Sequence, residues 1–253
     1  MKFVTTIVLA VLLAVFSTSD LQARQGGRGK CQGKGHGGRS CSTTIADLPT
    51  EDLNEAEKAS LLKMREEEKL ARDVYLTLGE KWDAKVFRNI PEAEQRHMDS
   101  VASLLERYEL DDPVTDDTVG AFASEEFAKL YQELVTKGSL SLADALTVGA
   151  TIEDLDIFDL NEALAGDVDN LDIRQVYDNL VRGSRNHMRA FAGSLEGEGK
   201  SYTPQYLSGE ELAAILDSDW ERGQGGKGGR GKGKGNGKGN CKGHGQGRGK
   251  CGD

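Results

Sequence analysis

The sequence predicts an all-α protein built around a four-helix bundle with additional short helices. Across the central residues 42–222, large apolar residues recur at spacings of three and four, the period of a helix with one buried face. No long stretch in this region alternates apolar and polar residues as a half-buried strand would. The whole chain has only four prolines, so long helices can run without interruption. Four long helical patterns with short connections are typical of such a bundle.

The first half of this region holds two long helices and one short helix. The first long helix is expected over residues 55–80 and the second over 91–109. Pro91 suits the first turn of the second helix, because the first turn leaves backbone N–H groups unpaired in any case. A shorter helix is expected over residues 124–137, since Ser124 is a good N-cap and Gly138 follows the last apolar position.

The second half holds the remaining two long helices. They are expected over residues 142–165, opened by Ser141 as N-cap, and over residues 170–193. Residues 202–218 predict a loop that docks on the helices and then a last short helix. A region of about 180 residues can bury a sizeable core, so one domain is the natural interpretation of residues 42–222.

Residues 1–23 have the pattern of a secretory signal peptide. Lys2 supplies a positive start, an apolar run follows over residues 4–16, and Ala23 ends a small-residue cleavage site. The apolar run is shorter than the roughly 20 residues that cross a membrane. We therefore expect cleavage near Ala23 and a secreted or periplasmic protein with no transmembrane segment in the mature chain.

Two segments of similar composition flank the central domain, at residues 24–41 and 223–253. Both are rich in glycine and basic residues and lack the apolar side chains that a packed core requires, so we expect them to be disordered. Because the whole chain has a formal net charge of −10, the central domain between these basic tails is strongly acidic. Each tail carries two cysteines with nine residues between them and one enclosed histidine: Cys31, His36 and Cys41, then Cys241, His244 and Cys251.

Several interpretations of the tails stay open. Disulfide bonds, within a tail or between the tails, are typical of paired cysteines in exported proteins. A Cys/His metal site is less consistent with the spacing, because zinc sites use closely spaced cysteine pairs. The basic charge could contact polyanions, although no aromatic residue stands between the lysines to stack on bases. The tails could also lie against the acidic domain or keep the protein soluble.

Five ionisable residues fall on the apolar faces of the predicted long helices. A carboxylate buried alone is strongly unfavourable, whereas a metal ion compensates for the desolvation of several carboxylates and accepts the lone pair of a neutral imidazole. Glu94 and His97 are three residues apart, which puts both on one side of a helix. Taken singly, the glutamates would be read as surface charges and His187 as a hydrogen-bonded histidine. Taken together, the predicted metal ligands are Glu68, Glu94, His97, Glu153 and His187.

Short motifs on these faces resemble the ferritin-like superfamily, which includes ferritins and rubrerythrins. The stretch EKLARDVY, from Glu68 to Tyr75, is similar to the first-helix motif of rubrerythrins, and EQRH, from Glu94 to His97, is similar to their second-helix Glu-x-x-His. The stretches GATIEDLDIFDL and GSRNHMRAF are similar to the third and fourth helices of a bacterial branch known mainly as a domain of unknown function. The resemblance covers residues 55–218 and implies a ferritin-like four-helix bundle.

This resemblance implies iron as the cofactor and a di-iron centre in the middle of the bundle. By position, Glu68 with help from His97 would hold one iron. Glu153 and His187 would hold the second iron. Glu94 would bridge the two.

The fourth helix departs from the pattern of the superfamily. Three residues before His187 stands Ser184 in place of a second glutamate, which removes one bridging carboxylate. Asp156 is a candidate substitute, and a single ion or another divalent metal is an alternative to two irons. Tyr75 and Tyr108 are expected either near the site or simply as core aromatics.

Two classes of function follow from these observations. The first is an exported ferritin-like metal-binding protein with oxidase or peroxidase-type redox activity, although no rubredoxin-like Cys-x-x-Cys pair is present to donate electrons. The second is a non-enzymatic envelope or extracellular binding protein, with the helices as scaffold and the basic Cys/His tails as contact segments. The separation of charge between tails and domain would also allow head-to-tail association into a homo-oligomer.

Overall fold

The computed structural model describes residues 45–166 and 168–222. The predicted signal peptide, residues 1–23, and the predicted tails, residues 24–41 and 223–253, lie outside these residues. The described part of the chain is all-α, as the sequence predicts, with six α-helices, one short 3-10 helix and no strand. Among the described residues, none of the helices combines the length and the apolar character needed to cross a bilayer.

Four of the helices are long and two are short. The helices are α1 (Glu55–Lys81), α2 (Lys85–Arg107), α3 (Glu125–Gly138), α4 (Leu142–Ala165), α5 (Leu171–Gly197) and α6 (Gly209–Asp217), with the 3-10 helix η1 (Ile45–Asp47) before them.

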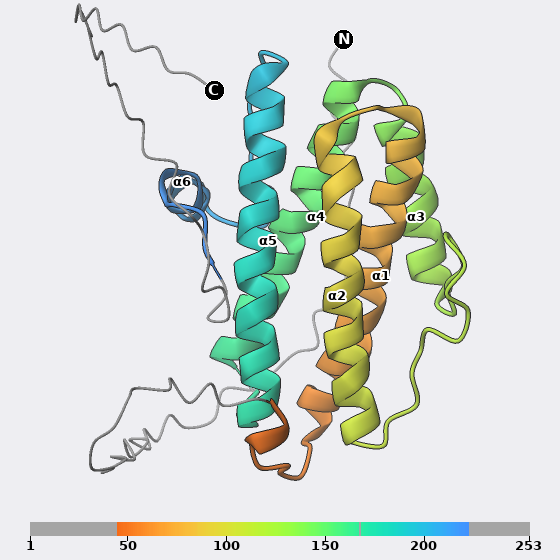
Figure 1. Ribbon diagram of the computed structural model, residues 1–253, viewed down its shortest axis with the longest axis vertical. Helices are drawn as coiled ribbons and strands as arrows, with labels where there is room; N and C mark the ends of the chain where they lie inside the picture. Colours follow the sequence, from red (N-terminus) through yellow and green to blue (C-terminus); the bar gives the residue numbers. More distant parts are fainter. Residues whose placement is uncertain (1–44, 167, 223–253) are drawn as a thin grey trace, which may run out of the picture. The chain divides into compact units, whose positions relative to one another are not determined.

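The four long helices pack in a ring, each against two others. Helix α1 contacts α2 and α4, and α5 also contacts α2 and α4 (Figure 1). Residues 82–84 join α1 to α2, and residues 166–170 join α4 to α5, so each of these pairs is an antiparallel hairpin. The longer connection from α2 to α4 contains α3, which packs against α1 and α4. Helix α6 packs against α5.

Side-chain caps begin the helices where the sequence predicts them. The Ser124 hydroxyl accepts a hydrogen bond from the backbone N–H of Phe127 at the start of α3, and the Ser141 hydroxyl accepts one from Asp144 at the start of α4. At the start of α1, the Asn54 side chain accepts from the backbone N–H of Glu57 in a capping box. These bonds satisfy N–H groups that the first helical turn cannot pair internally.

Two predicted boundaries are wrong. Helix α5 ends at Gly197 and not at residue 193, and the added turn buries Leu195. The start of α2 also differs. Helix α2 begins at Lys85, so Pro91 lies inside the helix and not in its first turn. A proline in this position removes one backbone hydrogen bond, the one that the Phe87 carbonyl would otherwise accept. The residues gained by the earlier start include Val86, Phe87 and Ile90, which are all buried. Their burial offsets the missing bond, so packing decides where this helix starts.

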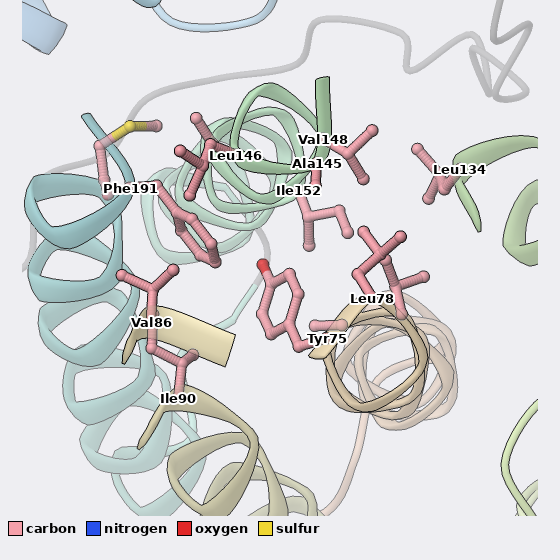
Figure 2. Close-up of a cluster of buried hydrophobic side chains, with 14 of the residues drawn as sticks. Tyr75, Leu78, Val86, Ile90, Leu134, Ala145, Leu146, Val148, Ile152 and Phe191 are labelled. Carbon is pink, nitrogen blue, oxygen red and sulfur yellow. The ribbon is translucent and has the colours of Figure 1, made fainter. Parts of the chain in front are cut away.

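The apolar core is divided into two clusters along the long helices. The first cluster is gathered around Tyr75, which projects from α1 toward α4 beside Phe191 of α5 (Figure 2). Each long helix contributes to both clusters, and on α1, α2 and α5 the polar residues between the two contributions lie near the helix middle. The first cluster includes Ala71, Val74, Tyr75, Leu78, Phe87, Ile90, Leu146, Ile152, Met188 and Phe191, and the second includes Leu61, Met64, Val101, Leu104, Leu160, Ile173, Tyr177, Leu180 and Val181.

A buried carboxylate on α1 holds the connection between α2 and α3. Asp73 is fully buried and lies 2.5 Å from the Lys69 ammonium and 2.7 Å from the Arg72 guanidinium. It also accepts a hydrogen bond from the backbone N–H of Gly120, and Lys69 donates a second bond to the carbonyl of Thr118. The loop before α3 is therefore fixed to α1 by charge-assisted hydrogen bonds, which are stronger than neutral ones.

A second buried carboxylate, Asp154 on α4, holds the segment that leads to α6. Its two oxygens accept hydrogen bonds from the backbone N–H groups of Gln205, Tyr206 and Leu207 and from the Tyr202 hydroxyl. This is the docking loop that the sequence predicts, ahead of a last short helix, within residues 202–218. Backbone N–H groups that have no helical partner are satisfied by one side chain here.

Candidate metal centre

The five predicted ligands meet in the middle of the ring of long helices. They come from all four long helices and lie between the two apolar clusters. The three carboxylates are at most 1% exposed, and the imidazole side chains are 14% exposed for His97 and 11% for His187. Four of the five predicted ligands lie one turn from a residue of the first cluster: Glu68 precedes Ala71, Glu94 follows Ile90, Glu153 precedes Ile157, and His187 precedes Phe191. The helical period therefore places polar ligand atoms in an apolar interior.

The first ligand group consists of Glu68, Glu94 and His97. One ligand atom from each lies within 4.8 Å of the others. The Nδ1 atom of His97 is 2.9 Å from a carboxylate oxygen of Glu94 and 3.2 Å from one of Glu68. Glu94 and His97 share one side of α2, whereas Glu68 reaches them from α1.

The second ligand group consists of Glu94, Glu153 and His187, again within 4.8 Å. The Nδ1 atom of His187 is 2.8 Å from Glu94 Oε1 and 3.5 Å from Glu153 Oε2. Glu94 therefore turns its Oε2 atom toward His97 and its Oε1 atom toward His187. The two imidazole rings are 5.5 Å apart between centroids, and Glu94 is the only residue that both groups contain.

Several ligand atoms of this cluster are buried without a hydrogen-bond partner. They include Glu68 Oε1, Glu94 Oε1, Glu153 Oε2 and His187 Nδ1. Glu94 Oε1 and His187 Nδ1 are only 2.8 Å apart, but their angles do not form a hydrogen bond. Buried polar atoms almost always have partners, so unpaired atoms that converge need an explanation. A cation bound between them would satisfy all of them at once, and the residues present fit a metal ion.

The hydroxyl of Tyr75 orients one of the ligands. It donates a hydrogen bond of 2.6 Å to Glu153 Oε1, and it lies 3.3 Å from the carbonyl oxygen of Gly149. The other oxygen, Oε2, is thereby left to face His187. Tyr108, the other tyrosine considered for the site, donates instead to Asp172 near the start of α5.

The position of the missing glutamate is occupied by a serine that binds its own helix. Ser184 is buried, and its hydroxyl donates to the carbonyl of Leu180. Asp156, the candidate substitute, is also buried but belongs to neither ligand group. Burial and the neighbouring charges of Glu68 and Glu153 raise its pKa well above the usual range. The structure therefore brings together five ligands and no second shared carboxylate.

The pKa values of the three carboxylates in the cluster are shifted in opposite directions. Burial favours the neutral form of Glu94, but the imidazoles of His187 and His97 outweigh burial and hold its pKa below the usual range. Burial raises the pKa of Glu68, and burial with the charge of Glu94 raises that of Glu153 to about 7. The shared carboxylate is therefore the one held as an anion.

The imidazoles are shifted in the opposite sense. Burial favours their neutral form, but Glu68 and Glu94 outweigh it and raise the pKa of His97 to about 10. Glu94 and Glu153 likewise raise the pKa of His187 well above its usual range. Without metal, protons on both rings thus provide the positive charge that the carboxylates require.

Two surface cavities of the described residues lie away from this centre. One, of about 310 Å³, is enclosed by α1 and the loop before α3 and includes Lys69 and Phe122 in its walls. The other, of about 600 Å³, is an open groove between α1 and α2 that includes Leu76 and Phe87. None of the five predicted ligands lines either cavity. Within the cluster, the two imidazoles are the most exposed side chains.

Residues 57–219 match a family model described as an uncharacterized protein domain, DUF2202. The chain belongs to the DUF2202 family. It is 56% identical over 179 residues to the uncharacterized protein MJ0754 of Methanocaldococcus jannaschii, a match that covers 71% of this chain and 96% of the relative. A crystal structure of the hypothetical protein MJ0754 is similar to it with a TM-score of 0.67 and 55% identity, over 69% of this chain and 99% of that chain.

The DUF2202 domain contains the whole candidate centre. All five predicted ligands, Tyr75 and both apolar clusters lie within residues 57–219. The predicted signal peptide and both predicted tails lie outside the matched region. The domain and the tails are therefore to be considered separately when a function is assigned.

Proposed function

We propose that this DUF2202 protein is an exported ferritin-like metal-binding protein that holds two iron ions and has oxidase or peroxidase-type redox activity. The observation that carries the proposal is the buried pair of ligand groups that share Glu94 and leave ligand atoms unpaired. Burying three carboxylates together is strongly unfavourable unless cations compensate. Four helices that each contribute to such a cluster favour a bound metal over an accident of packing.

The helix arrangement supports the ferritin-like part of the proposal. Two antiparallel hairpins, α1 with α2 and α4 with α5, are joined by one long connection. One long crossover between helix pairs is typical of ferritin-like bundles, and so is a metal centre formed by side chains from facing helices. The apolar clusters on both sides of the centre would exclude bulk water from it.

The donor set favours iron among common metals. Glu68, Glu94 and His97 would hold one ion, and Glu94, Glu153 and His187 would hold the other. Carboxylates with imidazoles suit iron, whereas sites without any thiolate are less typical of structural zinc. When bound, the iron pair would supply the redox chemistry with which oxygen or peroxide is reduced.

The residues of the chain have separate tasks in this proposal. Glu94 supplies the shared negative charge between the two imidazoles. The Tyr75 hydroxyl holds Glu153 with one oxygen turned toward His187. Since Ser184 offers no carboxylate, Glu94 is the one residue that both ions would share, and the ion at His187 would have fewer anionic ligands than in the superfamily pattern.

The test compares the metal content of the exported chain with that of its His97→Ala variant. Both carry serine at the four tail cysteines and alanine at the two tail histidines, so that the tails cannot contribute ligands. After anaerobic loading with ferrous iron, we expect about two ions per wild-type chain and about one in the variant, because His97 belongs to one group only. Metal analysis and circular dichroism are the measurements.

Oxygen consumption by the loaded protein tests the redox part of the proposal. A wild-type chain that consumes oxygen, with a variant that does not, supports an oxidase-type activity. Two stably bound ions without oxygen or peroxide turnover would restrict the function to metal binding. A wild-type chain that binds no metal would overturn the proposal and leave a helical scaffold whose tails make the contacts.

Metal binding is expected to become tighter between about pH 6 and about pH 9. In the metal-free protein the pKa of His97 is raised to about 10, so its imidazole is protonated over this range and loses a proton when metal binds. Because the metal-free state holds more protons than the metal-bound state, the apparent Kd falls as pH rises. Titration with cobalt(II) at several pH values measures this slope, and a Kd that does not change with pH would contradict it.

A further inference from the structure

A glycine in the middle of α5 has no backbone reason to be there. Gly183 lies inside the helix, where glycine is destabilising relative to alanine. It does not adopt the left-handed conformation, which in the described residues is confined to Glu109, Gly120 and Gly199. The sequence patterns did not single out this position, although a glycine in a helix interior is itself a signal of close packing.

The side chain of His97 occupies the space that a side chain at position 183 would need. A Cβ atom added to Gly183 would lie 2.4 Å from His97 Nε2 and 2.6 Å from its Cε1. These distances are far shorter than van der Waals contact, so the imidazole would have to move. The opposite nitrogen of the ring, Nδ1, is already held 2.9 Å from Glu94 and 3.2 Å from Glu68. The ring is therefore wedged between α5 and its two carboxylate partners.

We propose that Gly183 is a positioning residue for the first ligand group. Its missing side chain lets His97 stand within reach of Glu68 and Glu94, and any larger residue would force the imidazole out of this position. The inference rests on the proposed metal centre and deepens it, because it predicts unequal effects on the two groups. The three atoms nearest to an added Cβ all belong to His97, so we expect the second group to keep its arrangement.

The test is the Gly183→Ala variant, compared with Gly193→Ala in the same helix. A Cβ at Gly193 would meet nothing within 4 Å, so this control reports the effect of alanine on the helix alone. In chains without tail ligands, we expect Gly193→Ala to bind two ions like the wild type. We expect Gly183→Ala to keep one and to bind the other at least about tenfold more weakly, by metal analysis and cobalt(II) titration.

A double-mutant cycle without metal shows whether His97 carries the effect. With His97 intact, Gly183→Ala should melt below Gly193→Ala. In the His97→Ala background, both alanines should raise the melting temperature equally, because the clash is gone. If Gly183→Ala still lowers the melting temperature in the His97→Ala background, the effect does not come from His97 and the inference is overturned.

The two proposals fail in different ways. If Gly183→Ala binds two ions as tightly as the wild type, the inference is wrong and the metal centre stands. If the wild type itself binds no ion, the proposed function fails, and the role assigned to Gly183 fails with it.

Discussion

Replacing Glu94 with alanine is expected to abolish the binding of both metal ions, whereas the loss of any other ligand should leave one. Glu94 belongs to both ligand groups and turns one oxygen toward each imidazole. Its pKa is held low by those imidazoles, so it is the residue of the cluster most firmly kept as an anion. Without it, each site would keep one carboxylate and one imidazole, too few ligands for tight binding.

The control for this substitution lies on the same helix. Glu92 is exposed and pairs with Arg96 on the surface of α2, so Glu92→Ala removes the same charge without touching the centre. We expect this variant to bind two ions, and circular dichroism should show both variants to be helical. A Glu94→Ala chain that still holds one ion would show that the two groups do not share this carboxylate.

Replacing Asp73 with alanine is expected to lower the free energy of unfolding by about 3–5 kcal/mol. The carboxylate is fully buried and compensates the charge of Lys69, which is only 1% exposed, together with that of Arg72. Its removal leaves a buried ammonium whose remaining partners are the carbonyl of Thr118 and the face of the Phe122 ring. It also leaves the backbone N–H of Gly120 without its acceptor. Urea unfolding followed by circular dichroism measures the change.

An exposed aspartate near the end of the same helix provides the comparison. Asp83 forms an ion pair with Arg88, but both side chains are mostly exposed, and such pairs contribute little. Asp83→Ala should therefore leave the unfolding midpoint almost unchanged. Asp73→Asn should fall between the two, because the amide oxygen can still accept from Gly120. Equal midpoints for Asp73→Ala and Asp83→Ala would show that the buried network does not stabilise the fold.

Most of the secondary structure could be predicted from the sequence, because helix formation depends mainly on residues that are close together along the chain. The apolar spacing predicts all four long helices, and the caps Ser124 and Ser141 fix the starts of the short helix α3 and the long helix α4 to within a residue. The start of α2 was not predictable in this way. Pro91 is a local signal for a first turn, but burial of Phe87 and Ile90 against other helices outweighs it.

The residues of the cluster were predictable for a similar reason. A carboxylate or imidazole on an apolar face is visible from the helical period alone, and that is how Glu68 and His187 were found. The helical period does not determine which residues meet, because that depends on the position of each helix along the axis of its neighbour. The register of the four helices brings Glu94 between both imidazoles and leaves Asp156 and Tyr108 outside the ligand groups.

The sequence by itself therefore determined the helices and the faces that they bury. Only the tertiary structure decided that Glu94 turns one oxygen toward each imidazole, that Tyr75 orients Glu153, and that Gly183 makes room for His97. The physical reason is the range of the interactions. Helical periodicity and capping act over three or four residues, whereas a ligand cluster forms between side chains that are up to about a hundred residues apart in the chain.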